Sequence, residues 1–188
     1  AYEFGAEALP ADPSRTHTVA AYATRTVDEV RYVANAVHHF VPAGGDVAVT
    51  REVVQTESCN QCHNPLALHG GARREVALCI TCHSPQSVDP DTGHTVDFAV
   101  MVHKIHAGEH LPSVEAGASY QIVGFRQSVN DYSTVAFPRD LRSCVTCHSG
   151  AQGDHYLTRP NRAACGSCHD LTSFVDPAEE YSAARFRK

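Results

Sequence analysis

The chain has 188 residues, a formal net charge of −6 and no tryptophan. This length fits one domain with at most a small appendage. The negative charge argues against a nucleic-acid partner, and the lack of an apolar run of about 18 residues argues against a membrane-spanning helix.

The first part of the chain has the composition of β-strands. Residues 16–24 and 29–41 are rich in valine, threonine and aromatic residues and partly alternate between apolar and polar. Pro42 opens a glycine-containing turn, and a third such run follows at residues 47–54. The sequence therefore predicts about three strands before residue 55.

The chemistry of the chain is carried by four copies of Cys-x-x-Cys-His, which contain all eight cysteines. Two thiols three positions apart reach the two vinyl groups of one porphyrin, and the histidine that follows binds the iron as proximal ligand. A zinc ribbon or a disulfide framework gives no reason for a histidine after every second cysteine. The sequence therefore predicts four covalently bound haem c groups. The predicted attachment and proximal residues are Cys59, Cys62, Cys79, Cys82, Cys144, Cys147, Cys165 and Cys168, with His63, His83, His148 and His169.

Covalent haem also predicts the fold class and the compartment. Apolar porphyrins supply buried surface that side chains otherwise provide, so we expect a multihaem cytochrome c fold. It has a mostly α-helical and irregular haem-packed domain at residues 57–188, after a β-rich N-terminal segment at residues 1–56. Thioether attachment is completed after export, so we expect a signal peptide to have been removed. The expected location is the cell surface, the extracellular space or the periplasm.

One amphipathic helix is predicted between the two pairs of motifs, at residues 96–107. Apolar residues recur at helical spacing from residue 98 to residue 105, and Gly108 is a C-terminal stop. Residues 112–138 are predicted to be loop and short strand. The polar tail beyond Phe174 is predicted to be a short helix or partly disordered.

Of the thirteen histidines, nine lie outside the motifs and are candidates for the distal face of each iron. His103 and His106 stand one turn apart on the predicted helix, so their rings lie on one side and address two different haems. His69 is followed by two glycines, which allow a sharp backbone turn against a flat porphyrin. These three histidines are therefore predicted to be distal ligands.

The fourth distal ligand is left open by the sequence. His38 and His39 are adjacent on a predicted strand, so they face opposite ways and only one of them enters a haem pocket. We favour His39. The alternatives are His38, His155, His17 and a histidine from a neighbouring subunit.

Several segments resemble the outer-membrane decahaem cytochromes of the OmcA/MtrC family. They are residues 57–63, 66–73, 78–85, 89–93, 96–108, 137–144 and 164–170. The resemblance covers about residues 35–175, and it implies iron with histidine on both sides and the distal role at His69, His103 and His106. The strands before it resemble the end of the β-rich domain that precedes a haem domain in that family.

The sequence departs from this family at two expected histidines. Asn130 stands where the family often has a histidine, and residues 176–179 read Asp-Pro-Ala-Glu where it tends to have Gly-x-x-His. The fifth haem motif that such a domain commonly carries is also absent from the sequence. At least one haem must therefore take its distal ligand from elsewhere.

The expected function is electron transfer, with other multihaem cytochromes or extracellular electron acceptors as partners. Two histidines on each iron leave no position for a substrate, and Met101 is the only methionine, so methionine ligation is limited to one haem. The rival function is a multihaem reductase with one open haem. Self-association into a head-to-tail filament is a third expectation, as an elaboration of electron transfer.

Overall fold

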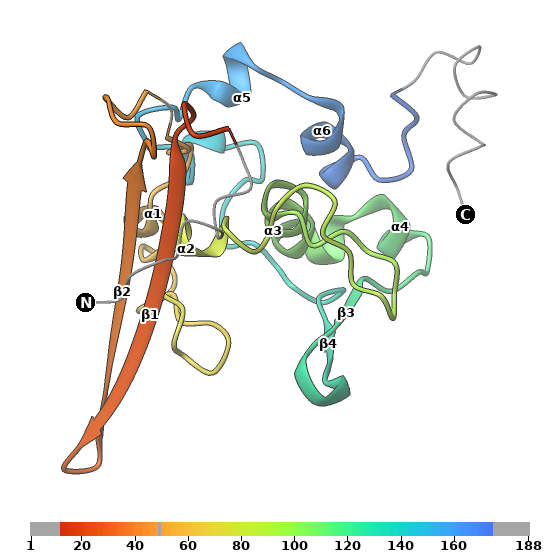
Figure 1. The fold of residues 1–188 in the computed structure, drawn as a ribbon. Helices are drawn as coiled ribbons and strands as arrows, with labels where there is room; N and C mark the ends of the chain where they lie inside the picture. The colour runs from red at the N-terminus through yellow and green to blue at the C-terminus, as the bar shows by residue number, and fades with distance from the viewer. Residues whose placement is uncertain (1–11, 49, 175–188) are drawn as a thin grey trace. The chain divides into compact units, whose positions relative to one another are not determined.

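The computed structural model describes residues 12–48 and 50–174 (Figure 1). The chain divides into two compact units. The first unit comprises the chain up to Cys82 together with Val145–Asp154, and the second comprises His83–Cys144 and the chain from His155 onward. The unit boundaries therefore pass through the second and third Cys-x-x-Cys-His motifs. The division of the sequence at residue 56 stays a prediction, because these units group residues by contact rather than by cofactor.

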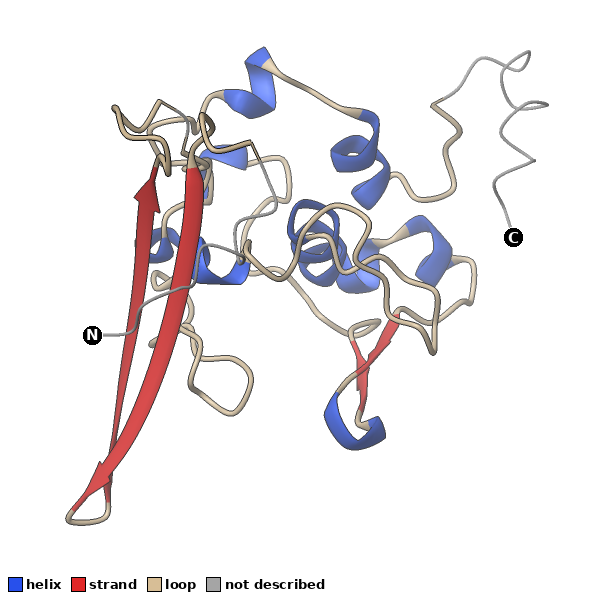
Figure 2. Ribbon diagram, in the orientation of Figure 1, coloured by secondary structure: helices blue, strands red, loops and turns tan. Residues whose placement is uncertain are grey.

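A long antiparallel hairpin is the main feature of the first unit (Figure 2). Strands β1 (His17–Val27) and β2 (Val30–Phe40) pair along their whole length. Asp28 and Glu29 connect them with positive φ angles of 47° and 66°, as a two-residue type I′ turn requires. This confirms the first two predicted strands.

The predicted third strand is wrong. Residues 47, 48 and 50–54 are irregular, because their backbone bonds a distant segment instead of a neighbouring strand. The Glu52 amide donates to the Gln152 side chain at 3.0 Å, and the Gln152 amide donates to the Glu52 carbonyl at 2.9 Å. These two bonds join parts of the first unit that lie about a hundred residues apart.

Two short helices complete the core of the first unit. Helix α1 (Thr56–Cys59) and helix α2 (Val76–Cys79) bury most of their side chains, and α2 packs against both strands of the hairpin. The Thr56 hydroxyl accepts from the Val76 amide at 2.9 Å and donates to Glu75 at 2.9 Å. These hydrogen bonds join the starts of the two helices.

The second unit is built on the predicted amphipathic helix, which is confirmed as α3 (Phe98–Ala107). It starts two residues later than predicted, because the Asp97 side chain caps it by accepting from the Ala99 amide at 3.1 Å. It ends at Gly108, where φ is 44° and a Cβ atom would lie only 2.1 Å from the Val135 carbonyl oxygen. Only glycine fits this stop.

The other elements of the second unit are short, and the predicted loop region 112–138 holds both helix and strand. Ala107, Leu111 and Tyr120 form a buried cluster beside α3, which also packs against the last helix, α6.

Within the described residues, no helix is long and apolar enough to cross a membrane. The predicted tail beyond Phe174 lies outside the described residues. The elements are η2 (Gly108–His110), α4 (Pro112–Glu115), β3 (Gln121–Val123), η3 (Phe125–Gln127), β4 (Val129–Asp131), α5 (His155–Thr158) and α6 (Arg162–Cys168), with η4 (Cys144–Thr146) at the boundary of the units.

Candidate haem-binding site

The first two Cys-x-x-Cys-His motifs have the same backbone conformation. Helix α1 ends at Cys59, and the amides of Cys62 and His63 both donate to the Cys59 carbonyl, at 3.1 and 2.9 Å. Helix α2 ends at Cys79, and the Cys82 amide donates to the Cys79 carbonyl at 3.2 Å. One helical turn across each motif brings its two cysteines to the same side of the backbone, as attachment to one porphyrin requires.

The third and fourth motifs are also helical. The third opens with the 3₁₀ turn η4, which begins at Cys144. The fourth lies in α6, where the His169 amide donates to the Cys165 carbonyl at 3.1 Å and Cys168 packs against the buried cluster beside α3. All four motifs therefore present their cysteines from a turn of helix.

No two of the eight cysteines are joined in a disulfide. Burial, together with the nearby Cys147 and Cys79 thiols, raises the pKa of Cys59 to about 11. Burial likewise raises the pKa of Cys79, and in the second unit that of Cys168, to which Cys144 also contributes. Thiols of different motifs thus lie close together within each unit, which fits closely spaced haems.

The two histidines of α3 are oriented by hydrogen bonds to their own helix. His103 Nδ1 donates to the Ala99 carbonyl at 2.6 Å, and His106 Nδ1 donates to the Val102 carbonyl at 2.8 Å. Because a carbonyl only accepts, the ring proton sits on Nδ1 and the lone pair on Nε2. This is the arrangement of a metal-binding histidine whose second nitrogen is fixed by a backbone carbonyl.

The two rings of α3 lie in different surroundings. Burial lowers the pKa of His103, so its imidazole is neutral and suited to bind iron. His106 meets the Phe137 ring edge-on, with ring centroids 5.5 Å apart. His83, a predicted proximal ligand, also donates from Nδ1 to a carbonyl, that of Val96, at 2.9 Å.

His69 lies at the tip of a tight loop, residues 68–73, which we name the His69 loop. Leu68 and Arg73 close it with two backbone hydrogen bonds of 3.0 and 3.2 Å. His69, Gly70 and Gly71 all have positive φ, at 50°, 71° and 78°. The glycines adopt this left-handed conformation freely, whereas for the histidine it costs about 1–3 kcal/mol. The predicted sharp turn at the two glycines is confirmed.

His38 and His39 lie in different environments, although they are adjacent in the sequence. On β2, His39 is half-buried and pairs with Thr18, whose hydroxyl lies 2.9 Å from His39 Nδ1. His38 is exposed and stacks on Phe40, with ring centroids 5.8 Å apart. His39 also lines a cavity of about 460 Å³ beside the helices of the first two motifs. The other lining residues are Thr50, Glu52, Val54, Gln55, Thr56, Glu57, Val76 and Ala77.

The two other candidates lie in different surroundings. His17 Nε2 donates to the Asp12 carbonyl at 3.1 Å, and its ring lies against Phe40 at 5.8 Å. His155 is half-buried at the start of α5 in the second unit. The cavity beside α1 and α2 is lined by His39 and not by His17 of the same unit. The fourth distal ligand stays a prediction.

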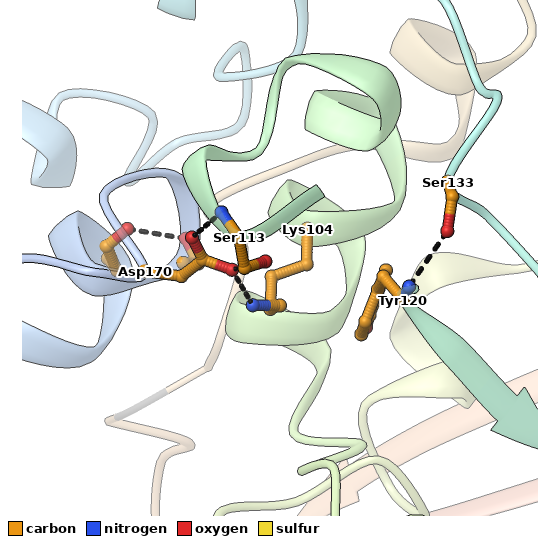
Figure 3. Close-up of polar contacts among 7 residues, drawn as sticks. Lys104, Ser113, Tyr120, Ser133 and Asp170 are labelled. Atoms are coloured by element: carbon orange, nitrogen blue, oxygen red, sulfur yellow. Dashed lines mark hydrogen bonds and ion pairs between the residues drawn. The ribbon is translucent and has the colours of Figure 1, made fainter. Parts of the chain in front are cut away.

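A buried ion pair next to the fourth motif was not predicted from the sequence. Lys104 Nζ lies 2.7 Å from Asp170 Oδ2, and their side chains are only 13% and 9% exposed (Figure 3). Ser113 donates to Asp170 from its amide at 3.0 Å and from its hydroxyl at 2.6 Å. Burial raises the pKa of Asp170, but the bonds from Lys104 and Ser113 and the lysine charge outweigh it, so the pKa is lowered. Asp170 directly follows the proximal ligand His169, so this pair ties the fourth motif to α3.

Two further features fit a bound porphyrin in the second unit. A cavity of about 400 Å³ lies between α3 and the fourth motif and is lined by Lys104, Gly166 and Asp170 among others. The Tyr120 hydroxyl is buried, has no hydrogen-bond partner among the described residues, and has its pKa raised to about 12, chiefly by burial. Buried phenols normally have a partner, and the carboxylates of a haem supply acceptors of this kind.

Paired thiols on helical turns, together with imidazoles whose Nδ1 is fixed by a carbonyl, are what covalently attached haem requires of a polypeptide. The protein is therefore a multihaem c-type cytochrome. Residues 51–185 match the family described as outer membrane cytochrome MtrC/MtrF-like, domains II/IV. The chain belongs to this family of outer-membrane multihaem cytochromes, which confirms the resemblance found in the sequence.

Two relatives show how much of a larger cytochrome this chain matches. It is 31% identical over 138 residues to the multiheme cytochrome MtrC of Shewanella baltica (strain OS185), which covers 70% of this chain and 16% of that protein. The crystal structure of the outer membrane decaheme cytochrome OmcA matches with a TM-score of 0.67 and 32% identity, over 81% of this chain and 24% of that one. The chain thus spans about a quarter or less of either relative.

Proposed function

We propose that this chain is a tetrahaem electron-transfer cytochrome of the cell surface or the extracellular space. Haem c, when bound, supplies an iron that exchanges single electrons between its ferric and ferrous states. The four cysteine pairs hold the porphyrins, which fits the placement of all eight cysteines within the motifs. The proximal faces are taken by His63, His83, His148 and His169.

Four further histidines take the distal faces: His69, His103, His106 and His39. The observation that supports this proposal is the pair of Nδ1 hydrogen bonds in α3, because an imidazole held at Nδ1 by a carbonyl is suited to bind a metal through Nε2, as we propose for His103 and His106. With an imidazole on both sides, no coordination position is left for a substrate. The chain therefore conducts electrons, and its partners are other multihaem cytochromes or extracellular electron acceptors.

The optical and electron paramagnetic resonance spectra of the oxidised holoprotein test this function. We expect wholly low-spin ferric iron. A high-spin ferric band in the unmodified protein would contradict the proposal and favour a multihaem reductase with one open haem.

Histidine variants test the ligands themselves. His103→Ala is expected to leave one iron high-spin while the others stay low-spin, and His106→Ala to do the same at another iron. His110→Ala is the matched control, because His110 is exposed and lies 3.6 Å from Glu109. Unchanged spectra in both α3 variants would refute the distal role of this helix.

We also propose that copies of the chain associate head to tail. Within the described residues, β1 and β2 form a sheet of only two strands, and an isolated hairpin is at best marginally stable. A strand from a neighbouring copy would pair with its open edge, and a contact that does not close would extend into a filament. Electron microscopy and light scattering of native preparations test this, and a monomer at all concentrations would contradict it.

A further inference from the structure

Side chains of β2 bind the backbone of the His69 loop and of the residue after it. Arg31 Nη1 donates to the Gly70 carbonyl at 2.6 Å. Asn35 makes two bonds: Nδ2 donates to the Ala72 carbonyl at 2.9 Å, and Oδ1 accepts from the Arg74 amide at 2.7 Å. A single strand thus contacts the backbone at three positions within five residues of His69.

Strand β1 contacts the same loop through an aromatic ring. The Arg73 guanidinium lies 4.5 Å from the centroid of the Tyr22 ring, and its Nη2 donates to the Tyr22 hydroxyl at 3.2 Å. Such cation–π contacts add to the hydrogen bonds. Both strands of the hairpin therefore hold the His69 loop, and all of these residues belong to the first unit.

The backbone of the His69 loop needs such support. His69 has a φ of 50°, a conformation that non-glycine residues adopt uncommonly and that persists only where the surroundings over-determine it. Within the loop, the closing bonds between Leu68 and Arg73 fix its ends. The bonds from Arg31 and Asn35 fix carbonyls on either side of Gly71, next to the strained residue.

We propose that the N-terminal hairpin, β1 and β2, positions His69. Arg31 and Asn35 are positioning residues that keep the His69 loop in the conformation from which the imidazole binds iron. This inference rests on the proposed distal role of His69. The inference also explains how the hairpin supports haem binding, because the first two motifs lie on either side of the His69 loop in the sequence.

Carbon monoxide uptake by the reduced holoprotein measures how firmly His69 is held, because carbon monoxide binds only where the distal ligand has left. A net hydrogen bond is worth about 1 kcal/mol, or about fivefold in an equilibrium. Asn35→Ala removes two bonds and is expected to speed uptake at one haem about 25-fold. Asn35→Asp keeps the acceptor for Arg74 and is expected to give about fivefold.

Arg31 supplies an independent and milder test, because its bond is exposed. Arg31→Ala is expected to speed uptake by at most about fivefold, and Arg31→Lys, which keeps a donor, to restore the slow rate. Arg25→Ala is the matched control, since Arg25 is an exposed arginine of the same hairpin, opposite Tyr32. It should leave the rate unchanged.

His69→Ala separates failure of the inference from failure of the proposed function. It is expected to bind one carbon monoxide per chain without delay. If it does so while the Arg31 and Asn35 variants keep the wild-type rate, the positioning role of the hairpin is wrong and the distal role of His69 stands. If His69→Ala binds none, both are wrong. Faster uptake at several haems in the hairpin variants would also overturn the inference, because it would indicate general loosening.

Discussion

Removing the Asp170 carboxylate is expected to destabilise the protein strongly. Asp170→Ala leaves the Lys104 ammonium buried without its counter-charge and deprives Ser113 of its acceptor. Breaking a buried ion pair by removing one partner costs about 3–5 kcal/mol. For a chain of this size each kcal/mol moves the melting temperature by about 2–4 °C, so the expected drop is about 6–20 °C.

Thermal unfolding of the holoprotein, followed by circular dichroism, measures this drop. Asp140→Ala is the matched control: Asp140 and Arg142 lie 2.6 Å apart, but their side chains are 53% and 90% exposed, so little change is expected. The double variant Lys104→Met/Asp170→Ala should melt above Asp170→Ala alone, because the unpaired buried charge is gone. Equal melting of Asp170→Ala and Asp140→Ala, or no recovery in the double variant, would refute the reasoning.

Three further predictions follow from the site and the fold. Pyridine haemochrome quantitation should give four haems per polypeptide, and two or fewer would overturn the proposed function. His39→Ala should produce a high-spin iron at every protein concentration; if dilution of the unmodified protein does so instead, the ligand comes from a neighbouring subunit. Hydrogen bonds from Thr92 and the Val123 amide lower the pKa of Asp89 below its ordinary value of 3.8. The stability that this carboxylate contributes is therefore fully present above pH 3.8, and it is lost as the pH falls through the lowered pKa. Asp89→Ala should therefore melt below the wild type at neutral pH, and a difference that did not narrow in acid would contradict this.

Local sequence signals predicted the elements that depend on neighbouring residues. The apolar spacing and Gly108 located α3, and alternation located both strands of the hairpin. The start of α3 was placed two residues early, because the apolar pattern does not distinguish a helix that begins at Val96 from one that begins at Phe98. The Asp97 carboxylate decides it by capping the Ala99 amide.

Features that depend on distant residues could not be predicted in this way. Residues 47–54 have a strand-like composition, but Glu52 bonds Gln152, a hundred positions away, and no local pattern reports such a partner. Lys104 and Asp170 are 66 residues apart, and a lysine on a helix is ordinarily a solvent-facing residue. The haem motifs are recognisable without a fold because their chemistry lies within five consecutive residues. The distal histidines come from separate segments, and their pairing with particular irons stays a prediction.

The first unit is discontinuous in the chain, and this sets an order of folding. The first unit contains residues on both sides of a long intervening segment, residues 83–144. Glu52 and Ser58 form hydrogen bonds with Gln152 and Ser149, which follow this segment in the sequence. Synthesis runs from the N-terminus, and closing a loop of this length costs more entropy than forming local contacts. A nascent chain that ends before residue 145 therefore carries the first two motifs without the segment that completes their unit. For this unit, assembly must wait until the third motif has been made, although its two strands are synthesised more than a hundred residues earlier.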